Sequence, residues 1–165
     1  SKAVVGVIMA VAGEYEEAIR LAKEAVSNEP NSYLAHRGLG LALGWQGKHE
    51  EATAALERAL EVSGRHLWTL YDLAAEYVAL GRWDEANLLK EELRERSKRE
   101  NILPSWSSMT MIEGLLGNLD AAFEALELAY AERDTLLPFA RYWPGFDPLR
   151  DDPRWDEFLR KMGLD

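Results

Sequence analysis

The chain has 165 residues, 47% of them hydrophobic, so it can bury a core without the help of a metal or a disulfide. It contains no cysteine, which excludes disulfides, thiolate metal sites and cysteine nucleophiles and favours a reducing, cytoplasmic location. The formal net charge of −10 repels phosphate backbones and anionic lipid surfaces, so we expect no nucleic acid and no membrane as partner.

The first predicted helix, at residues 3–12, is apolar on almost every side. Its apolar run is shorter than a membrane span, which needs about 20 residues. It has neither a capping residue before it nor a polar face. We therefore expect either that the chain is a fragment of a longer array, whose earlier repeats cover this helix, or that it forms a homodimer through the N-terminal helix or the groove described below.

One short motif recurs four times along the chain. It places a large residue two positions after a glycine and an alanine three positions later. The copies are Gly13-Glu-Tyr15-Glu-Glu-Ala18, Gly47-Lys-His49-Glu-Glu-Ala52, Gly81-Arg-Trp83-Asp-Glu-Ala86 and Gly117-Asn-Leu119-Asp-Ala-Ala122. Their period of 34 to 36 residues is typical of helix-turn-helix repeats. It predicts an all-α fold of four hairpins, at residues 1–32, 33–66, 67–102 and 103–134.

Each position of the motif has a physical reason. Glycine ends the first helix because the left-handed turn there is costly for a residue with a Cβ. Alanine lets the two helix axes approach closely, and a small residue stands at the matching place in three of the four first helices. These small residues are Gly6, Gly40 and Ala74, whereas the fourth hairpin has the larger Thr110.

Helix-ending residues lie in the links between hairpins, at Pro30, Gly64 and Pro104. The second helix of the third hairpin lacks a proline directly after it. Instead, Glu92 and Glu95 each stand four residues before an arginine, an arrangement that stabilises a continuing helix. We therefore expect this helix to be longer than its fellows.

Residues 135–165 do not repeat the motif and predict a C-terminal capping helix. Asp152 can cap a helix that has Pro153 in its first turn. This helix has one apolar face that can lie on the last hairpin, made of Trp155, Phe158, Leu159 and Met162. A helical solenoid needs an end cap of this kind.

The four motif copies resemble the tetratricopeptide repeat, and residues 142–164 resemble the tail that closes such arrays in many bacterial signalling proteins. The resemblance implies a single domain over residues 1–165, a right-handed superhelical solenoid of four hairpins plus the cap. It also implies a protein-interaction scaffold that binds a peptide or helical segment in a concave groove, without catalysis or a cofactor, as a module of a larger bacterial signalling or regulatory protein. Self-association is the alternative function.

In that family the first helix of each hairpin lines the groove. Counting along the motif gives the groove residues Leu34, Arg37, Gly38, Leu41, Trp45, Trp68, Tyr71, Asp72, Val78, Ser107, Ser108 and Met111. Trp, Tyr and Arg are frequent binding hot spots, although Trp45 and Trp68 have the alternative of packing between adjacent repeats. The clamp by which some of these grooves hold a terminal carboxylate is absent. An apolar or amphipathic segment is therefore the expected ligand.

No group of residues predicts catalysis or metal binding. The three histidines, His36, His49 and His66, fall at different places in their hairpins and do not converge. The glycines of the second hairpin's first helix follow no strand, so they do not indicate a phosphate loop. No serine has the setting of a nucleophile. A small-molecule enzyme is the remote alternative.

Overall fold

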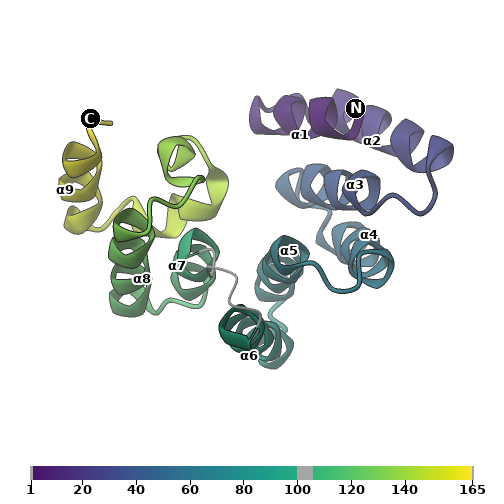
Figure 1. The fold of residues 1–165 in the computed structure, drawn as a ribbon. Helices are drawn as coiled ribbons and strands as arrows, with labels where there is room; N and C mark the ends of the chain where they lie inside the picture. Colours follow the sequence, from purple (N-terminus) through teal and green to yellow (C-terminus); the bar gives the residue numbers. More distant parts are fainter. Residues whose placement is uncertain (1, 100–105, 165) are drawn as a thin grey trace. The chain divides into compact units, whose positions relative to one another are not determined.

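The computed structural model describes residues 2–99 and 106–164, with the side chains of residues 6–96, 99 and 106–164. Every regular element within these ranges is a helix, which confirms the all-α fold class (Figure 1). The chain divides into two compact units, Ser1–Leu89 and Lys90–Asp165. That residues 1–165 act as one domain, and that the repeats wind into a right-handed superhelix, stay predictions.

The helices form the predicted hairpins, followed by a C-terminal segment. The hairpins are α1 (Lys2–Val11) with α2 (Tyr15–Asn28), α3 (Tyr33–Trp45) with α4 (His49–Val62), α5 (Leu67–Ala79) with α6 (Trp83–Arg99), and α7 (Trp106–Leu115) with α8 (Leu119–Ala131). The C-terminal segment has the 3-10 helices η1 (Leu137–Phe139) and η2 (Pro144–Leu149) and the helix α9 (Pro153–Met162). Pro104, expected in the link before the fourth hairpin, lies outside the described residues.

Each hairpin turns at the glycine of the recurring motif. The φ angles are 85°, 84°, 71° and 80° at Gly13, Gly47, Gly81 and Gly117. In the second hairpin the Gly47 N–H donates to the Gly44 carbonyl at 2.9 Å. The Lys48 N–H donates to the Leu43 carbonyl, also at 2.9 Å, and together these bonds satisfy the end of α3. The predicted left-handed turn is confirmed.

The alanine of the motif lies where the two helices of a hairpin cross. Ala52 on α4 is fully buried. A Cβ added at Gly40 on α3 would lie 2.5 Å from Leu56 Cγ and 3.3 Å from the Ala52 carbonyl oxygen. The close approach of α3 and α4 therefore depends on these small residues, as the sequence predicts.

We expect Ala52→Leu to lower the free energy of unfolding by about 1–3 kcal/mol, because the larger side chain overpacks the crossing. Denaturant unfolding followed by circular dichroism measures the loss. Ala54→Leu is the matched control, since Ala54 is exposed on the same helix and the identical replacement there should change the stability by less than about 0.5 kcal/mol. Equal losses in both variants would contradict the crossing argument.

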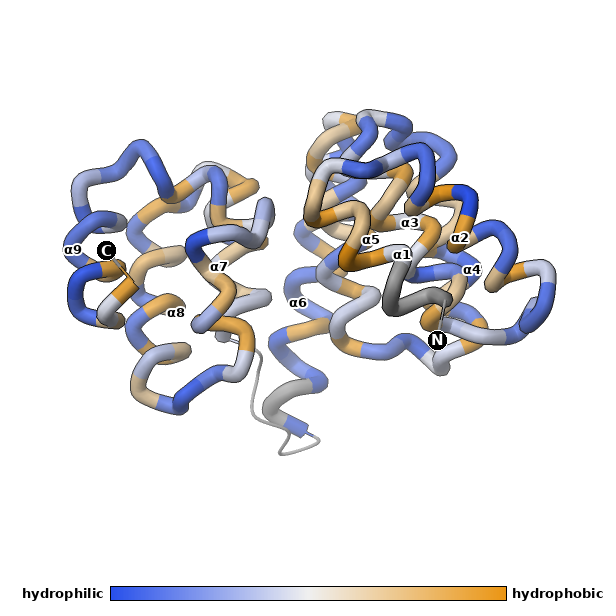
Figure 2. Tube along the Cα trace, turned by 90° about the horizontal axis from the view of Figure 1, so that it is seen from above, coloured by the Kyte–Doolittle hydropathy of each residue, from blue (hydrophilic) through white to orange (hydrophobic). Residues whose placement is uncertain are grey.

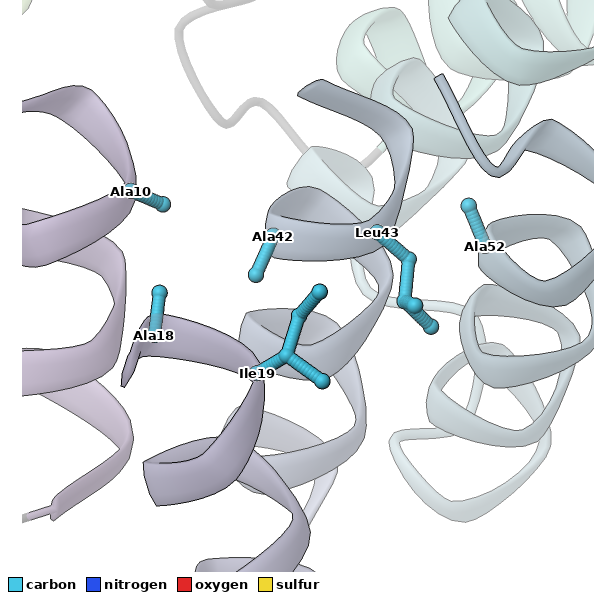
Figure 3. Packing of buried hydrophobic residues seen from close by; sticks show 6 residues of the cluster. All are labelled: Ala10, Ala18, Ile19, Ala42, Leu43 and Ala52. Carbon is cyan, nitrogen blue, oxygen red and sulfur yellow. The ribbon is translucent and has the colours of Figure 1, made fainter. Parts of the chain in front are cut away.

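A hydrophobic core joins the first two hairpins of the Ser1–Leu89 unit. Its buried members come from α1 to α4 and are Ala10, Ala18, Ile19, Ala42, Leu43 and Ala52 (Figure 3). Trp45 is half-buried and packs against this core. In Figure 2, α3 and α5 are coloured mainly hydrophobic, while α2 and α4 carry more hydrophilic residues. The first helices thus supply much of the apolar surface of this unit.

The second helix of the third hairpin is longer than its fellows, as predicted. α6 has 17 residues, whereas α2 and α4 have 14 each and α8 has 13. An ion pair at 2.9 Å joins Arg94 to Glu91, three residues earlier on the helix, and such pairs stabilise a helix with few apolar residues. Within the described ranges, no helix, α6 included, is long and apolar enough to cross a membrane.

The helix α9 packs on the last hairpin of the Lys90–Asp165 unit. The Asp152 carboxylate accepts a hydrogen bond from the Arg154 N–H at 3.0 Å, and Pro153 begins the helix, so the predicted cap is confirmed. Three of the four predicted apolar residues, Trp155, Phe158 and Leu159, are buried, and Met162 is half-buried. Phe158 meets the α8 residue Tyr130 edge to face, with ring centroids 6.2 Å apart.

The 3-10 helix η2 ties the C-terminal segment to α7 and α9. Phe146 and Leu149 are fully buried. Phe146 stacks on Trp155 of α9, with ring centroids 5.8 Å apart. A Cβ added at Gly114 of α7 would lie 2.6 Å from Leu149 Cδ1, so this glycine makes room for the Leu149 side chain.

Candidate partner-binding face

The structure places the predicted groove residues of the Ser1–Leu89 unit at three depths. Trp68 and Leu34 are exposed, with 47% and 42% of their surface open to solvent. The half-buried residues are Arg37, Trp45 and Val78. The buried residues are Gly38, Leu41, Tyr71 and Asp72. Trp68 and Leu34 are thus the predicted residues of this unit that are most accessible to a partner.

The predicted groove residues of the Lys90–Asp165 unit lie on α7. All three, Ser107, Ser108 and Met111, are buried. Asp134, in the link after α8, accepts a hydrogen bond from the Ser107 N–H at 3.1 Å and so satisfies a backbone donor at the start of α7. In this unit the predicted residues therefore contribute no exposed side chain.

Arg37 and His66 contact the exposed ring of Trp68. The Arg37 guanidinium, on α3, lies over the ring, 5.2 Å from its centre. His66 meets Trp68 edge to face at 6.4 Å and stacks on Tyr33 at 5.2 Å. As the N-cap of α5, His66 also accepts a hydrogen bond from the Trp68 N–H. We call the four residues Tyr33, Arg37, His66 and Trp68 the Trp68 cluster.

A buried carboxylate fixes the position of Arg37. The Nε of Arg37 lies 2.5 Å from Oδ2 of Asp72, and the Nη2 of Arg37 lies 3.4 Å from Oδ1 of Asp72. Only 12% of the Arg37 side chain and 1% of the Asp72 side chain are exposed. Burial raises the pKa of the Asp72 carboxyl, and the charge and hydrogen bonds of Arg37 oppose that rise. Asp72 of α5 therefore holds the Arg37 guanidinium in place over the Trp68 ring.

A second carboxylate lies one turn further along α5. Glu76 is buried, and its Oε2 lies 2.8 Å from His49 Nδ1 on α4. A Cβ added at Gly44 would lie 2.0 Å from Glu76 Oε1, so Gly44 leaves the space that the carboxylate fills. The repeat pattern does not single out Glu76. The signal that could have found it is an acidic residue four positions after Asp72 in a mainly apolar helix.

Burial raises the pKa of Glu76, although the hydrogen bond to His49 lowers it in part. The folded protein therefore holds the Glu76 proton more tightly than the unfolded chain does. This stabilisation is full below the ordinary pKa of 4.5 and is lost as the pH rises through the raised value. We therefore expect the Tm of Glu76→Gln to rise relative to that of the wild type between about pH 4 and pH 8. Thermal unfolding of both proteins measures this, and a difference in Tm independent of pH would contradict it.

The three histidines have separate, local roles. His36 Nε2 lies 2.8 Å from the Pro30 carbonyl oxygen. His49 contacts Glu76, and His66 caps α5. Within the described part of the chain, no group of three or more His, Cys, Asp or Glu residues could hold a metal ion.

A comparison with known proteins finds a family match over the second and third hairpins. Residues 32–99, which comprise α3 to α6, match the family model described as the tetratricopeptide repeat. No curated protein matches the chain. The matched stretch contains the Trp68 cluster together with Asp72 and Glu76, so the family match coincides with the hairpins that carry the candidate face.

Proposed function

We propose, from the premise that this chain is a tetratricopeptide repeat protein, that it holds a peptide or helical segment of a partner protein on the face formed by α3 and α5. Tetratricopeptide repeats generally mediate protein–protein interaction, and proteins of this family are typically scaffolds without catalysis. The location of the face and the apolar character of the bound segment are the parts that we propose.

The exposed ring of Trp68 is the observation that carries the proposal. Tryptophan is prominent among binding hot spots because a large rigid ring gives much contact area at a small cost in conformational entropy. The ring is already contacted by Arg37, which Asp72 holds in turn, so little ordering remains to be done on binding. Leu34 stands at the equivalent position one repeat earlier and is also exposed. The two side chains therefore offer exposed apolar groups at the same position of adjacent repeats.

The charge balance of this face favours an apolar ligand. Arg37 is paired with Asp72, so neither is left to attract an opposite charge from a partner. Arg37 is therefore not available to hold a terminal carboxylate. An amphipathic segment that places one apolar side chain against Trp68 fits better.

Peptide selection from a random library, followed by affinity measurements, tests the proposal. We expect the selected peptides to bind Trp68→Ala at least about tenfold more weakly than the wild type, because the anchor ring is gone. Helicity should change little, since the ring is half exposed. Trp83→Ala is the matched control because Trp83 is 51% exposed but lies on a second helix. Peptides that bind the two variants equally well would count against this face.

The cellular setting is a further part of the proposal. The tail at residues 142–164 is similar to the one that closes tetratricopeptide arrays in many bacterial signalling proteins. This supports a module of a larger bacterial signalling or regulatory protein. The lack of cysteine supports a cytoplasmic location.

Self-association is a second candidate function, favoured by α1. Ile8 is 62% exposed and Val11 is 38% exposed, so this helix presents apolar side chains to solvent. Light scattering over a range of protein concentrations separates the two functions. A mass that rises to that of a dimer would favour self-association, whereas a constant monomer mass would leave partner binding as the function.

A further inference from the structure

A groove of about 710 Å³ lies between α8 and α9 of the Lys90–Asp165 unit, the two neighbouring helices of Figure 1. The aromatic rings of Phe123 and Phe158, which are 8% and 3% exposed, contribute to its lining. Six charged side chains also line it, namely Asp120, Glu124 and Glu127 of α8 and Arg154, Glu157 and Lys161 of α9. The groove thus combines buried rings with more carboxylates than cations.

At one end of the groove, a cation of α9 is held by a ring and a carboxylate of α8. Arg154 Nη1 lies 2.9 Å from Asp120 Oδ1. The Arg154 guanidinium also lies over the Phe123 ring, 4.2 Å from its centre. A cation so placed gains from both the negative charge and the face of the ring.

The other end repeats this arrangement seven residues further along both helices. Lys161 forms an ion pair with Glu127. Its ammonium lies over the Tyr130 ring, 4.4 Å from the centre. The two helices are thus bridged twice, each time by a cation of α9 over an aromatic ring and beside a carboxylate of α8.

Between these bridges the groove carries two carboxylates. Glu124 follows Asp120 by four residues on α8, and Glu157 follows Arg154 by three on α9, so both stand at helical positions between the bridges. Among the described residues, none gives either carboxylate a hydrogen bond or an ion pair. Both carboxylates are exposed, so a cation that enters the groove can reach them.

We propose that the middle of this groove binds a lysine or arginine side chain from a basic segment of a partner protein. Charge complementarity carries the assignment, because Glu124 and Glu157 provide two carboxylates for one cation. The apolar stem of the basic side chain would lie along the small exposed edges of Phe123 and Phe158. The two bridges show that the same groove already holds cations by this chemistry. This site shares no residue with the Trp68 cluster and does not depend on the function proposed for it.

The probe is a trilysine peptide with blocked ends, titrated into the isotope-labelled full chain and followed by the NMR shifts of the backbone amides. We expect saturable shifts concentrated in α8 and α9. Glu124→Gln/Glu157→Gln should weaken binding at least about tenfold, because both carboxylate charges are lost. The matched control is Glu50→Gln/Glu51→Gln, which removes the same charge from exposed residues of α4 and should leave the affinity within about twofold of the wild type.

A second variant tests the missing cation directly. Glu157→Lys places a positive charge between the bridges, so it should abolish peptide binding. Equal weakening by the two glutamine variants would overturn the proposal, because it would reveal attraction by the overall charge alone. Unchanged binding by Glu157→Lys would also overturn it. A linear polyamine that binds as tightly as the peptide would overturn the assignment to a protein side chain.

Discussion

Replacing Arg37 with alanine should lower the free energy of unfolding by about 3–5 kcal/mol, the usual cost of leaving a buried charge without its partner. Asp72 would keep its place on α5, with 1% of its side chain exposed, and would lose both contacts from the guanidinium. Denaturant unfolding near neutral pH measures the loss. A loss below about 1 kcal/mol would mean that the pair behaves like an ion pair at the surface.

The loss should shrink as the pH falls. Burial raises the pKa of Asp72, and the Arg37→Ala variant lacks the charge that opposes this rise. The folded variant therefore binds a proton at Asp72 more tightly than the unfolded chain does. Its stability is highest below the ordinary pKa of 3.8 and decreases as the pH rises through the raised value. Losses that are equal at about pH 5 and pH 8 would contradict this account.

The double variant Arg37→Met/Asp72→Leu tests whether the lost stability comes from the unpaired buried charge or from lost packing. Apolar side chains of similar volume leave no charge to desolvate, so most of the lost stability should return. Binding at the Trp68 cluster should not return, because the guanidinium that lies over the ring is absent. A double variant as unstable as Arg37→Ala would show that the loss comes from packing instead.

The repeat itself can be predicted from the sequence because its determinants are local. A glycine at a left-handed turn and an alanine at a helix crossing recur at a fixed spacing, and the structure confirms both at Gly47 and Ala52. The Asp152 cap is equally local, since it needs only the backbone two residues ahead. Each of these features is determined within a few residues of chain or by one repeat period.

The contacts of the candidate face join different helices, which the sequence does not reveal. Arg37 and Asp72 were both expected on this face, yet their pairing depends on how α3 lies beside α5. The space at Gly44 and the carboxylate of Glu76 that fills it are 32 residues apart in the chain. The repeat register shows which side of a helix a residue occupies. It does not show whether that residue is buried in the fold, as Tyr71 is.

Phe146→Ala should lower the stability of the Lys90–Asp165 unit by about 3–5 kcal/mol, because a fully buried ring is replaced by a cavity between η2 and α9. A loss of that size is a large share of the roughly 5–15 kcal/mol that stabilise a domain. Hydrogen exchange of the backbone amides in α7, α8 and α9 measures it locally. Phe139→Ala is the matched control, since Phe139 is 58% exposed and its removal should have little effect.

Phe146→Ala also tests whether the packing of α9 supports the groove between α8 and α9. Because Phe146 stacks on Trp155 of α9, its loss should loosen α9 and weaken trilysine binding between α8 and α9. Binding at the Trp68 cluster should persist, since that cluster belongs to the Ser1–Leu89 unit. Phe146→Leu keeps most of the apolar volume and should show a smaller loss in the same direction if the unit still folds. Faster exchange confined to η2, with α9 and peptide binding unchanged, would show that the stack does not hold the cap.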